Sequence, residues 1–328
     1  MRKLFLLAIF SLLQFYTFGQ KVHYNIPEGY ESEISSEDYK RIVDLSVLIT
    51  SKRYTIDFVK DGTIQLKKGQ DIEALNLHNI ISKCMAAGEK SQWEKVISEH
   101  FKNLFISLDE QKKIDPLNFE SIKKYLSIRI YPAETVNKRG GAVSLVAKVD
   151  MEGTYTLLML DLPGAFTAVQ KKIFDQWNKD FAEVFRIAQA NINNQRVEKA
   201  TQHFDIDDVN IEVCFLGDED YAASYALDLM HNAPEFVGEW GSVVAVPNKG
   251  IVDICKISRE KPVDFVKFIQ LTKPLVEKAY AEHPQPISNQ FFWYYKGKFT
   301  RITVLSDAKG NINVISPIGL SELMTEKK

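Results

Sequence analysis

Two apolar, β-branched runs flank the tetrapeptide Pro247-Asn248-Lys249-Gly250. Such a tetrapeptide is typical of a tight turn, and its glycine permits a positive φ at no steric cost. Neither run alternates strictly between apolar and polar residues, which favours burial of both faces. The pattern therefore predicts that residues 242–257 form a β-hairpin near the centre of a sheet.

Before residue 110, apolar positions recur mainly at helical spacing. The pattern predicts three helices, at about residues 35–49, 71–87 and 91–108. Ser35 or Ser36 is expected to cap the first helix, and Asp71 the second. A hairpin is expected at residues 54–66, because Asp61-Gly62 is a strong two-residue turn signal.

From residue 119 onward, hairpins alternate with helices. Strands are expected at about residues 127–131, 143–149, 154–160, 209–216, 291–295 and 299–305. Helices are expected at residues 119–126, at 166–192 in one piece or two, at 221–231, and from Pro262 with a kink or break at Pro274. This alternation predicts an α+β fold, with an antiparallel or mixed sheet built from hairpins with packed helices, preceded by a smaller, mainly helical region.

A polar stretch at residues 109–118 contains Pro116 and separates the two patterns. Such a stretch indicates a domain boundary or a loose connection. We therefore expect a small helical or α+β region at residues 20–110, a connection at residues 111–126 and an α+β domain at residues 127–320.

The first residues have the layout of a secretory signal peptide, predicted at residues 1–19. Arg2 and Lys3 precede an apolar run, and Thr17 and Gly19 supply small residues before the expected cleavage point. The apolar run is too short to span a bilayer. We therefore expect a soluble protein that is exported to the periplasm or secreted, without stable membrane insertion.

Composition narrows the class of protein further. Hydrophobic residues make up 45% and charged residues 26% of the 328 residues, as in ordinary globular proteins. Lysine and arginine number 41 against 43 acidic residues, so there is no basic excess for a nucleic-acid partner. Three cysteines are too few for a disulfide framework. A disulfide between Cys214 and Cys255 could form in an oxidising compartment. We instead expect buried free thiols, which behave as small hydrophobic residues.

Four short sequence segments after residue 119 resemble, in their order and composition, those of a known protein family. They are Ile128-Arg129-Ile130-Tyr131, Phe215-Leu216-Gly217-Asp218-Glu219-Asp220-Tyr221, Val243-Val244-Ala245-Val246-Pro247 and the closing Phe-Trp-Tyr-Tyr-Lys-Gly-Lys-Phe hairpin. At about residues 129–305 the chain thereby resembles the YtpQ-like family of uncharacterised bacterial proteins. The resemblance implies an architecture and no activity, and this chain differs from the family members by its export signal.

Acidic residues supply the first candidates for a functional site. Asp218 and Asp220 lie between an expected strand and an expected helix, where carboxylates suit cation binding or acid–base chemistry. Capping of the helix by Asp220 is the simpler interpretation. Asp253 stands in the apolar hairpin, where a buried carboxyl group would have a raised pKa and need a partner. Exposure to solvent, or pairing with Arg301 across the sheet, is the simpler interpretation there.

Trp293 is the last candidate, as part of the aromatic run at residues 291–295. An exposed aromatic face would bind a glycan or peptide, whereas packing against helices is the commoner role of such a run. No metal-ligand spacing, nucleophile elbow, phosphate-binding glycine loop or dinucleotide fingerprint is present, so no metal and no cofactor is predicted.

The sequence thus leaves two hypotheses for function. The first is a non-catalytic binding or interaction module with a protein, peptide or glycan partner. The alternative is a hydrolase with an acidic cleft, in which Asp218, Asp220 and Asp253 converge. The hypotheses differ in whether these carboxylates lie within hydrogen-bonding or shared-metal distance of one another.

Overall fold

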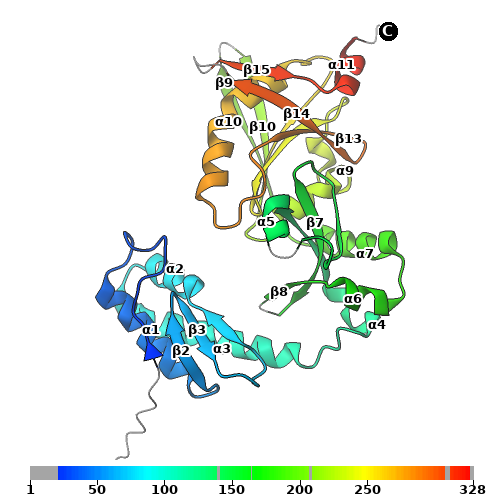
Figure 1. Ribbon diagram of the computed structural model, residues 1–328. Helices are drawn as coiled ribbons and strands as arrows, with labels where there is room; N and C mark the ends of the chain where they lie inside the picture. The colour runs from blue at the N-terminus through cyan, green and yellow to red at the C-terminus, as the bar shows by residue number, and fades with distance from the viewer. Residues whose placement is uncertain (1–20, 139–140, 164, 207–208, 307–310, 326–328) are drawn as a thin grey trace, which may run out of the picture. The chain divides into compact units, whose positions relative to one another are not determined.

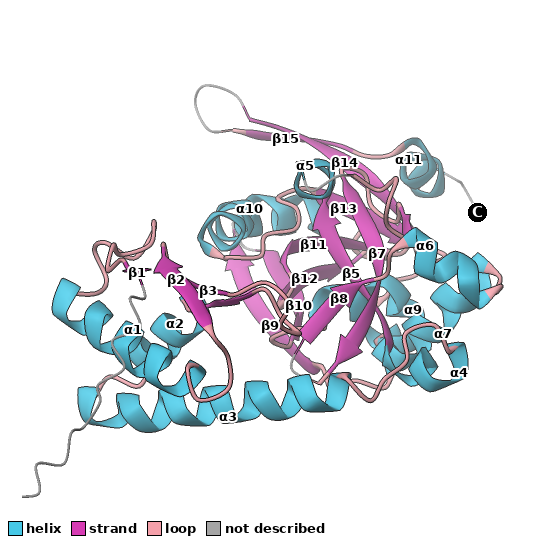
Figure 2. Cartoon of the chain, turned by 60° about the horizontal axis from the view of Figure 1, so that its bottom comes forward, coloured by secondary structure: helices cyan, strands magenta, loops and turns pink. Residues whose placement is uncertain are grey.

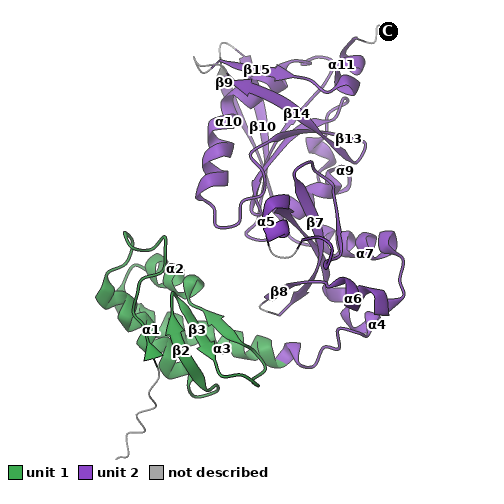
Figure 3. Ribbon diagram, in the orientation of Figure 1, with its two compact units in different colours: residues 1–109 green, residues 110–328 purple. Residues whose placement is uncertain are grey.

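A computed structural model describes residues 21–138, 141–163, 165–206, 209–306 and 311–325. The chain divides into two compact units, residues 1–109 and 110–328 (Figure 3). The expected signal peptide lies outside the described residues. Within the described residues, no helix combines the length and the apolar character that a membrane span requires.

The first unit is an α+β unit with a four-stranded sheet in the order β1-β2-β3-β4. Strand β1 is parallel to β2, and the other pairs are antiparallel. Its elements are β1 (Lys21–Val22), α1 (Ser36–Thr50), β2 (Ile56–Lys60), β3 (Thr63–Leu66), β4 (Ala74–Asn76), α2 (His78–Ala86), the 3₁₀ helix η1 (Lys90–Gln92) and α3 (Trp93–Gln111). The last residues of α3 pass into the second unit.

Local signals in this unit are mostly confirmed. The Ser35 hydroxyl accepts a hydrogen bond from the backbone N–H of Asp38 at 3.2 Å and so caps α1. Asp61 and Gly62 both have positive φ in the tight turn between β2 and β3. The prediction that Asp71 caps the second helix is wrong, because β4 intervenes and α2 has Leu77 as its N-cap residue.

The second unit begins with short helices and a small antiparallel sheet (Figure 1). In this sheet β7 pairs with β5, β6 and β8. The elements up to the long β9–β10 hairpin are α4 (Phe119–Ile122), η2 (Lys123–Tyr125), β5 (Leu126–Pro132), α5 (Ala133–Lys138), β6 (Ala147–Lys148), β7 (Thr154–Leu162), β8 (Ala165–Ala168), α6 (Lys171–Phe174), η3 (Asp175–Trp177), α7 (Phe181–Asn193), β9 (Glu198–Ile206) and β10 (Val209–Gly217).

A seven-stranded antiparallel sheet in the order β15-β14-β13-β11-β12-β10-β9 forms the rest of this unit. The remaining elements are α8 (Ala222–Tyr225), η4 (Ala226–Asp228), α9 (Leu229–Asn232), η5 (Pro234–Phe236), β11 (Ser242–Asn248), β12 (Ile251–Lys256), α10 (Asp264–Glu282), β13 (Phe291–Tyr295), β14 (Lys298–Ser306), β15 (Ile312–Ile315) and α11 (Ile318–Thr325). The predicted hairpin at residues 242–257 is confirmed, because β11 and β12 are central strands and every residue of β11 is buried.

Helix α10 lies beside the seven-stranded sheet (Figure 2). Side chains from the two faces of this sheet enter different cores. On one face, Val243 and Cys255 pack with α10 residues such as Phe268. On the other, Val244 and Ile254 pack with α7, α8 and strands of the small sheet. Adjacent residues of a strand point to opposite faces of the sheet. When both faces are buried, consecutive residues of the strand are therefore all apolar.

The α+β class is confirmed for both units, but several expected elements differ. Only Ala147–Lys148 is a strand within residues 143–149, and Phe166 lies in β8 instead of starting a helix. Pro274 does not divide the last long helix, because α10 continues through it. Residues 119–126 are part of the second unit and contribute Phe119 to its core.

The three cysteines are buried free thiols. Cys214 pairs in register with Ile254, and its side chain belongs to the core on the α7 and α8 face of the sheet. Cys255 is the next residue of β12 and therefore points to the α10 face. Burial raises the pKa of both thiols.

Candidate functional site

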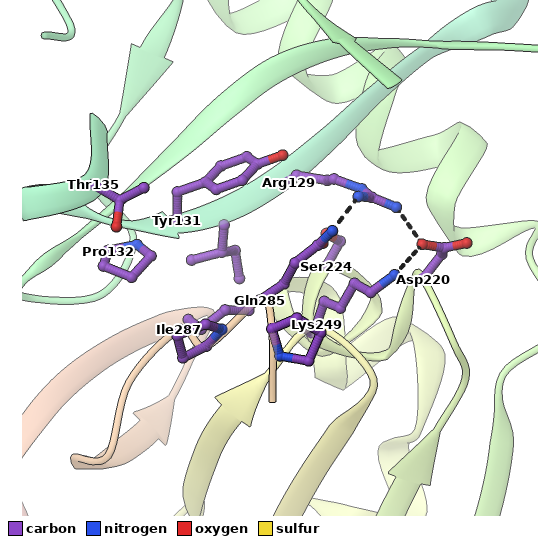
Figure 4. Close-up of a pocket in the computed structure, with 13 residues that line it drawn as sticks. Arg129, Tyr131, Pro132, Thr135, Asp220, Ser224, Lys249, Gln285 and Ile287 are labelled. Atoms are coloured by element: carbon purple, nitrogen blue, oxygen red, sulfur yellow. Dashed lines mark hydrogen bonds and ion pairs between the residues drawn. The ribbon is translucent and has the colours of Figure 1, made fainter. Parts of the chain in front are cut away.

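A pocket of about 290 Å³ lies in the second unit, where four segments distant in sequence meet (Figure 4). The segments are the end of β5 with the start of α5, the residues from 220 to 224 around the start of α8, the turn between β11 and β12, and residues 284–287 after α10. Backbone hydrogen bonds join each of these segments to a neighbouring strand or turn of the same unit. The pocket is therefore formed by regular parts of the fold.

The turn between β11 and β12 is fixed to the start of α8. The backbone N–H of Ala223 donates to the Lys249 carbonyl at 3.1 Å, and that of Asp218 donates to the Gly250 carbonyl at 3.1 Å. Gly250 has no positive φ, contrary to expectation. A Cβ atom there would lie 3.0 Å from the Asp218 carbonyl oxygen, so close backbone approach is the reason for this glycine.

Two cations in the pocket share one carboxylate oxygen. An Nη2 atom of Arg129 lies 2.5 Å, and Nζ of Lys249 lies 2.6 Å, from Oδ1 of Asp220. The Arg129 side chain is 9% exposed, Lys249 17% and Asp220 34%. Burial by itself would raise the pKa of Asp220, but Lys249, followed by Arg129, outweighs burial and holds that pKa below its ordinary value.

The Arg129 guanidinium is stacked on an aromatic ring and keeps unused donors. Its central carbon lies 3.5 Å from the centroid of the Phe166 ring, a close cation–π contact. Nη1 lies 3.5 Å from Oε1 of Gln285. Nε is buried and has no hydrogen-bond partner among the described residues. The Lys249 ammonium, with three N–H groups, makes one hydrogen bond to the described residues. The two cations therefore have more N–H donors than the described residues satisfy.

A second polar pair lies behind this cluster. The Tyr221 hydroxyl donates to Oδ2 of Asp161 at 2.5 Å, and the Tyr221 ring contacts Phe166 at 5.9 Å between centroids. Burial raises the pKa of Asp161, although Tyr221 and Arg129 act in the opposite direction. Burial and the hydrogen bond to Asp161 raise the pKa of Tyr221 above its ordinary value. Asp161 is therefore engaged with Tyr221 and does not line the pocket.

The structure separates the roles of Asp218 and Asp220. Oδ1 of Asp218 accepts hydrogen bonds from the backbone N–H groups of Asp220 and Tyr221, at 2.8 and 2.7 Å. The expectation that Asp220 is the capping residue is thus incorrect: Asp218 satisfies these N–H groups, and Asp220 faces Arg129 and Lys249.

Asp253 lies on the opposite face of the seven-stranded sheet from α8. It pairs in register with Ala245 and Phe215, both of which pack in the core beneath α10. It is 7% exposed and makes no hydrogen bond or ion pair to any described residue. Arg301 is not its partner, because Arg301 binds Glu152 at 2.9 Å. Burial raises the pKa of Asp253 to about 6.

Trp293 is buried in the same core as Asp253. Its indole N–H donates to the Trp240 carbonyl at 2.7 Å, and its ring stacks on Tyr295 with 5.1 Å between centroids. Residues 291–294 are all buried. The aromatic run is therefore a core strand and presents no exposed aromatic face for a glycan.

The sequence did not single out the two cations as site residues. Arg129 carries a detectable signal, since it is the one charged residue in the apolar strand β5. Lys249 carries none, because a lysine in a turn is ordinary. No group of three His, Cys, Asp or Glu side chains in the described ranges is placed to hold a metal ion.

No protein-family model, curated protein or solved structure matches the chain.

Proposed function

We propose that this chain is an exported, non-catalytic binding protein that holds an anionic ligand in the pocket between Arg129 and Lys249. The observation that carries the proposal is the pair of cations that line the pocket, Arg129 and Lys249, whose ion pairs among the described residues all go to one oxygen, Oδ1 of Asp220. The Lys249 ammonium has three N–H groups and makes one hydrogen bond to the described residues, so it can donate to an anionic ligand.

Charge supports the same conclusion. Of the side chains that line the pocket, Arg129 and Lys249 are cationic and Asp220 is anionic, which leaves one positive charge unbalanced. Arginine suits this role because its guanidinium stays charged and presents several donors in a fixed plane. The stack on Phe166 holds that plane in place.

The alternative of a hydrolase with an acidic cleft has less support. Asp218 is engaged with backbone N–H groups, Asp220 with two cations, and Asp253 faces the other side of the sheet. These carboxylates therefore lack the shared cleft that acid–base catalysis would require.

Calorimetric titration of the full chain with acetate, benzoate and inorganic phosphate tests anion binding. We expect saturable binding of at least one anion and a loss of at least ten-fold in affinity for Lys249→Gln. Lys256→Gln is the matched control, because Lys256 is ion-paired with Glu212 at 2.6 Å and does not line the pocket. Absence of binding, or equal weakening by both variants, would refute the proposal.

Export and family membership are separate parts of the proposal. The signal-peptide pattern supports export, and N-terminal sequencing of protein from the native host should begin at Gln20. Recovery of the intact first 19 residues would contradict it. The four shared sequence runs support the YtpQ-like architecture for residues 129–305, and superposition on an experimental structure from that family would test it.

A further inference from the structure

We propose that the ligand of this pocket is a compact organic monocarboxylate, with its carboxylate at Arg129 and Lys249 and an apolar body against the opposite wall. The inference rests on the proposed anion binding and adds the chemical class of the ligand. The apolar wall consists of Ile130, Tyr131, Pro132, Pro284, Pro286 and Ile287.

The charge of the pocket matches a monoanion. Of the lining side chains, Arg129, Lys249 and Asp220 sum to one positive charge, and the Asp161 carboxyl group lies behind them, so the site favours a singly charged anion over a dianion. A phosphate monoester carries close to two negative charges at pH 7 and would leave an excess of negative charge beside Asp220.

Three backbone N–H groups at the start of α8 already have acceptors within the protein. Phosphate sites commonly draw on backbone N–H groups at glycine-rich turns and helix N-termini. Here, the N–H groups of Asp220 and Tyr221 already donate to Asp218, and that of Ala223 donates to the Lys249 carbonyl. These donors are therefore not available to a ligand.

Residues 284–287, on the other side of the pocket, also have few backbone N–H groups available to a ligand. Pro284 and Pro286 have no N–H group. The N–H of Gln285 donates to Nδ1 of His283 at 2.9 Å, and that of Ile287 donates to the Pro247 carbonyl at 2.9 Å. The ligand is consequently recognised through side chains, of which the Arg129 fork and the Lys249 ammonium suit the two oxygens of a carboxylate.

The charged residues gather at one end of the pocket. Figure 4 shows Arg129 and Lys249 directed at Asp220, with Pro132 and Thr135 lying away from that ion cluster. A ligand with a charged head and an apolar body therefore has one favourable orientation. The pocket volume of about 290 Å³ lies at the lower end of the range for small-molecule sites, which restricts the body to a small group.

Four probes test the inference by calorimetry on the full chain: acetate, which lacks a ring, and the phenyl compounds benzoate, benzamide and phenyl phosphate. We expect benzoate to bind about ten-fold or more tightly than acetate, because the ring buries apolar area against the wall. It should exceed phenyl phosphate by a similar factor, and benzamide should not bind.

Tyr131→Ala tests the apolar wall. The variant should weaken benzoate binding at least three-fold and leave acetate binding unchanged, because acetate does not reach the wall. Tyr155→Ala is the matched control, because Tyr155 pairs with Tyr131 in the neighbouring strand β7 but does not line the pocket. Equal effects of the two variants on benzoate would overturn the orientation proposed here.

The outcomes separate this inference from the proposed function. If phenyl phosphate or acetate binds as tightly as benzoate, and Lys249→Gln weakens them all, anion binding stands and the monocarboxylate inference fails. The inference also fails if benzamide equals benzoate, because the carboxylate is then irrelevant. If inorganic phosphate alone binds, anion binding stands and the monocarboxylate inference fails. If no anion binds, both proposals fail.

Discussion

Nζ of Lys249 lies 2.6 Å from Oδ1 of Asp220, the same oxygen that accepts a hydrogen bond from Arg129. Lys249 is 29 positions and Arg129 is 91 positions from Asp220 in the chain. The carboxylate thus ties β5 and the β11–β12 turn to the segment before α8. Without Asp220, two mostly buried cations would lose the carboxylate that pairs with both of them.

Replacing Asp220 should therefore destabilise the second unit. For Asp220→Asn we expect a loss of about 1–3 kcal/mol in the free energy of unfolding at pH 7, below the cost of breaking a fully buried pair because Asp220 is 34% exposed. Urea denaturation measures this loss, with Asp175→Asn as the control because Asp175 is exposed. A loss no larger than that of the control would contradict the role assigned to Asp220.

The same variant should show a defined pH dependence. The cations hold the pKa of Asp220 below its ordinary value. A lowered pKa in the folded state contributes stability above the unfolded pKa of about 3.9 and loses it as pH falls through the folded pKa. The stability difference between the wild type and Asp220→Asn should therefore be constant from pH 7 to about pH 5 and shrink below about pH 4. Denaturation series at these pH values test the sign.

Asp253 should have the opposite pH dependence. Burial raises its pKa from 3.8 to about 6, a gap that corresponds to ~3 kcal/mol. A raised carboxyl pKa makes the folded state less stable above that pKa, and the penalty disappears as pH falls toward the unfolded pKa. Relative to the wild type, Asp253→Asn should gain up to ~3 kcal/mol between pH 4 and pH 7.5, measured by urea denaturation. A difference that does not vary with pH would show that Asp253 is not buried.

The Phe166 ring should matter for ligand binding through Arg129. Phe166→Leu removes the cation–π contact, worth roughly 0.5–2 kcal/mol, and should weaken anion binding about three- to ten-fold. Phe166→Tyr keeps an aromatic face and should restore binding in calorimetric titration. Phe174→Leu is a control for the loss of a half-buried ring, since Phe174 packs on Trp177 and does not contact Arg129. Equal affinity of Phe166→Leu and the wild type would contradict this positioning role.

The cysteines should be unreactive in the folded protein. Burial raises the pKa of Cys84 and Cys214 to about 11, so little thiolate forms at pH 8. A thiol-specific reagent at pH 8 should label the protein slowly in buffer and react with three thiols in urea. Intact mass after air oxidation should remain that of the reduced chain, because Cys214 and Cys255 point to opposite faces of the sheet. A mass lower by two hydrogens would reveal a disulfide and contradict this arrangement.

Several features of the fold were readable from local patterns. Turn chemistry at Asp61-Gly62, the cap at Ser35 and the unbroken apolar runs of residues 242–257 each depend on neighbouring residues. Local patterns were misleading where tertiary contacts decided the outcome. Phe166 fitted a helical repeat, yet it pairs in register with Asp161 as part of β8 and covers the Arg129 guanidinium.

The sequence by itself determined the α+β class and the central hairpin, because hydrophobic periodicity and turn residues act over a few positions. Only the tertiary structure decided the site. Asp220 looked like a helix cap until the fold placed Arg129 and Lys249 beside it. Asp253 looked equally suited to that site until the alternation of β12 turned it to the α10 face. Sheet register and strand alternation set these relationships, and both depend on pairings between distant parts of the chain.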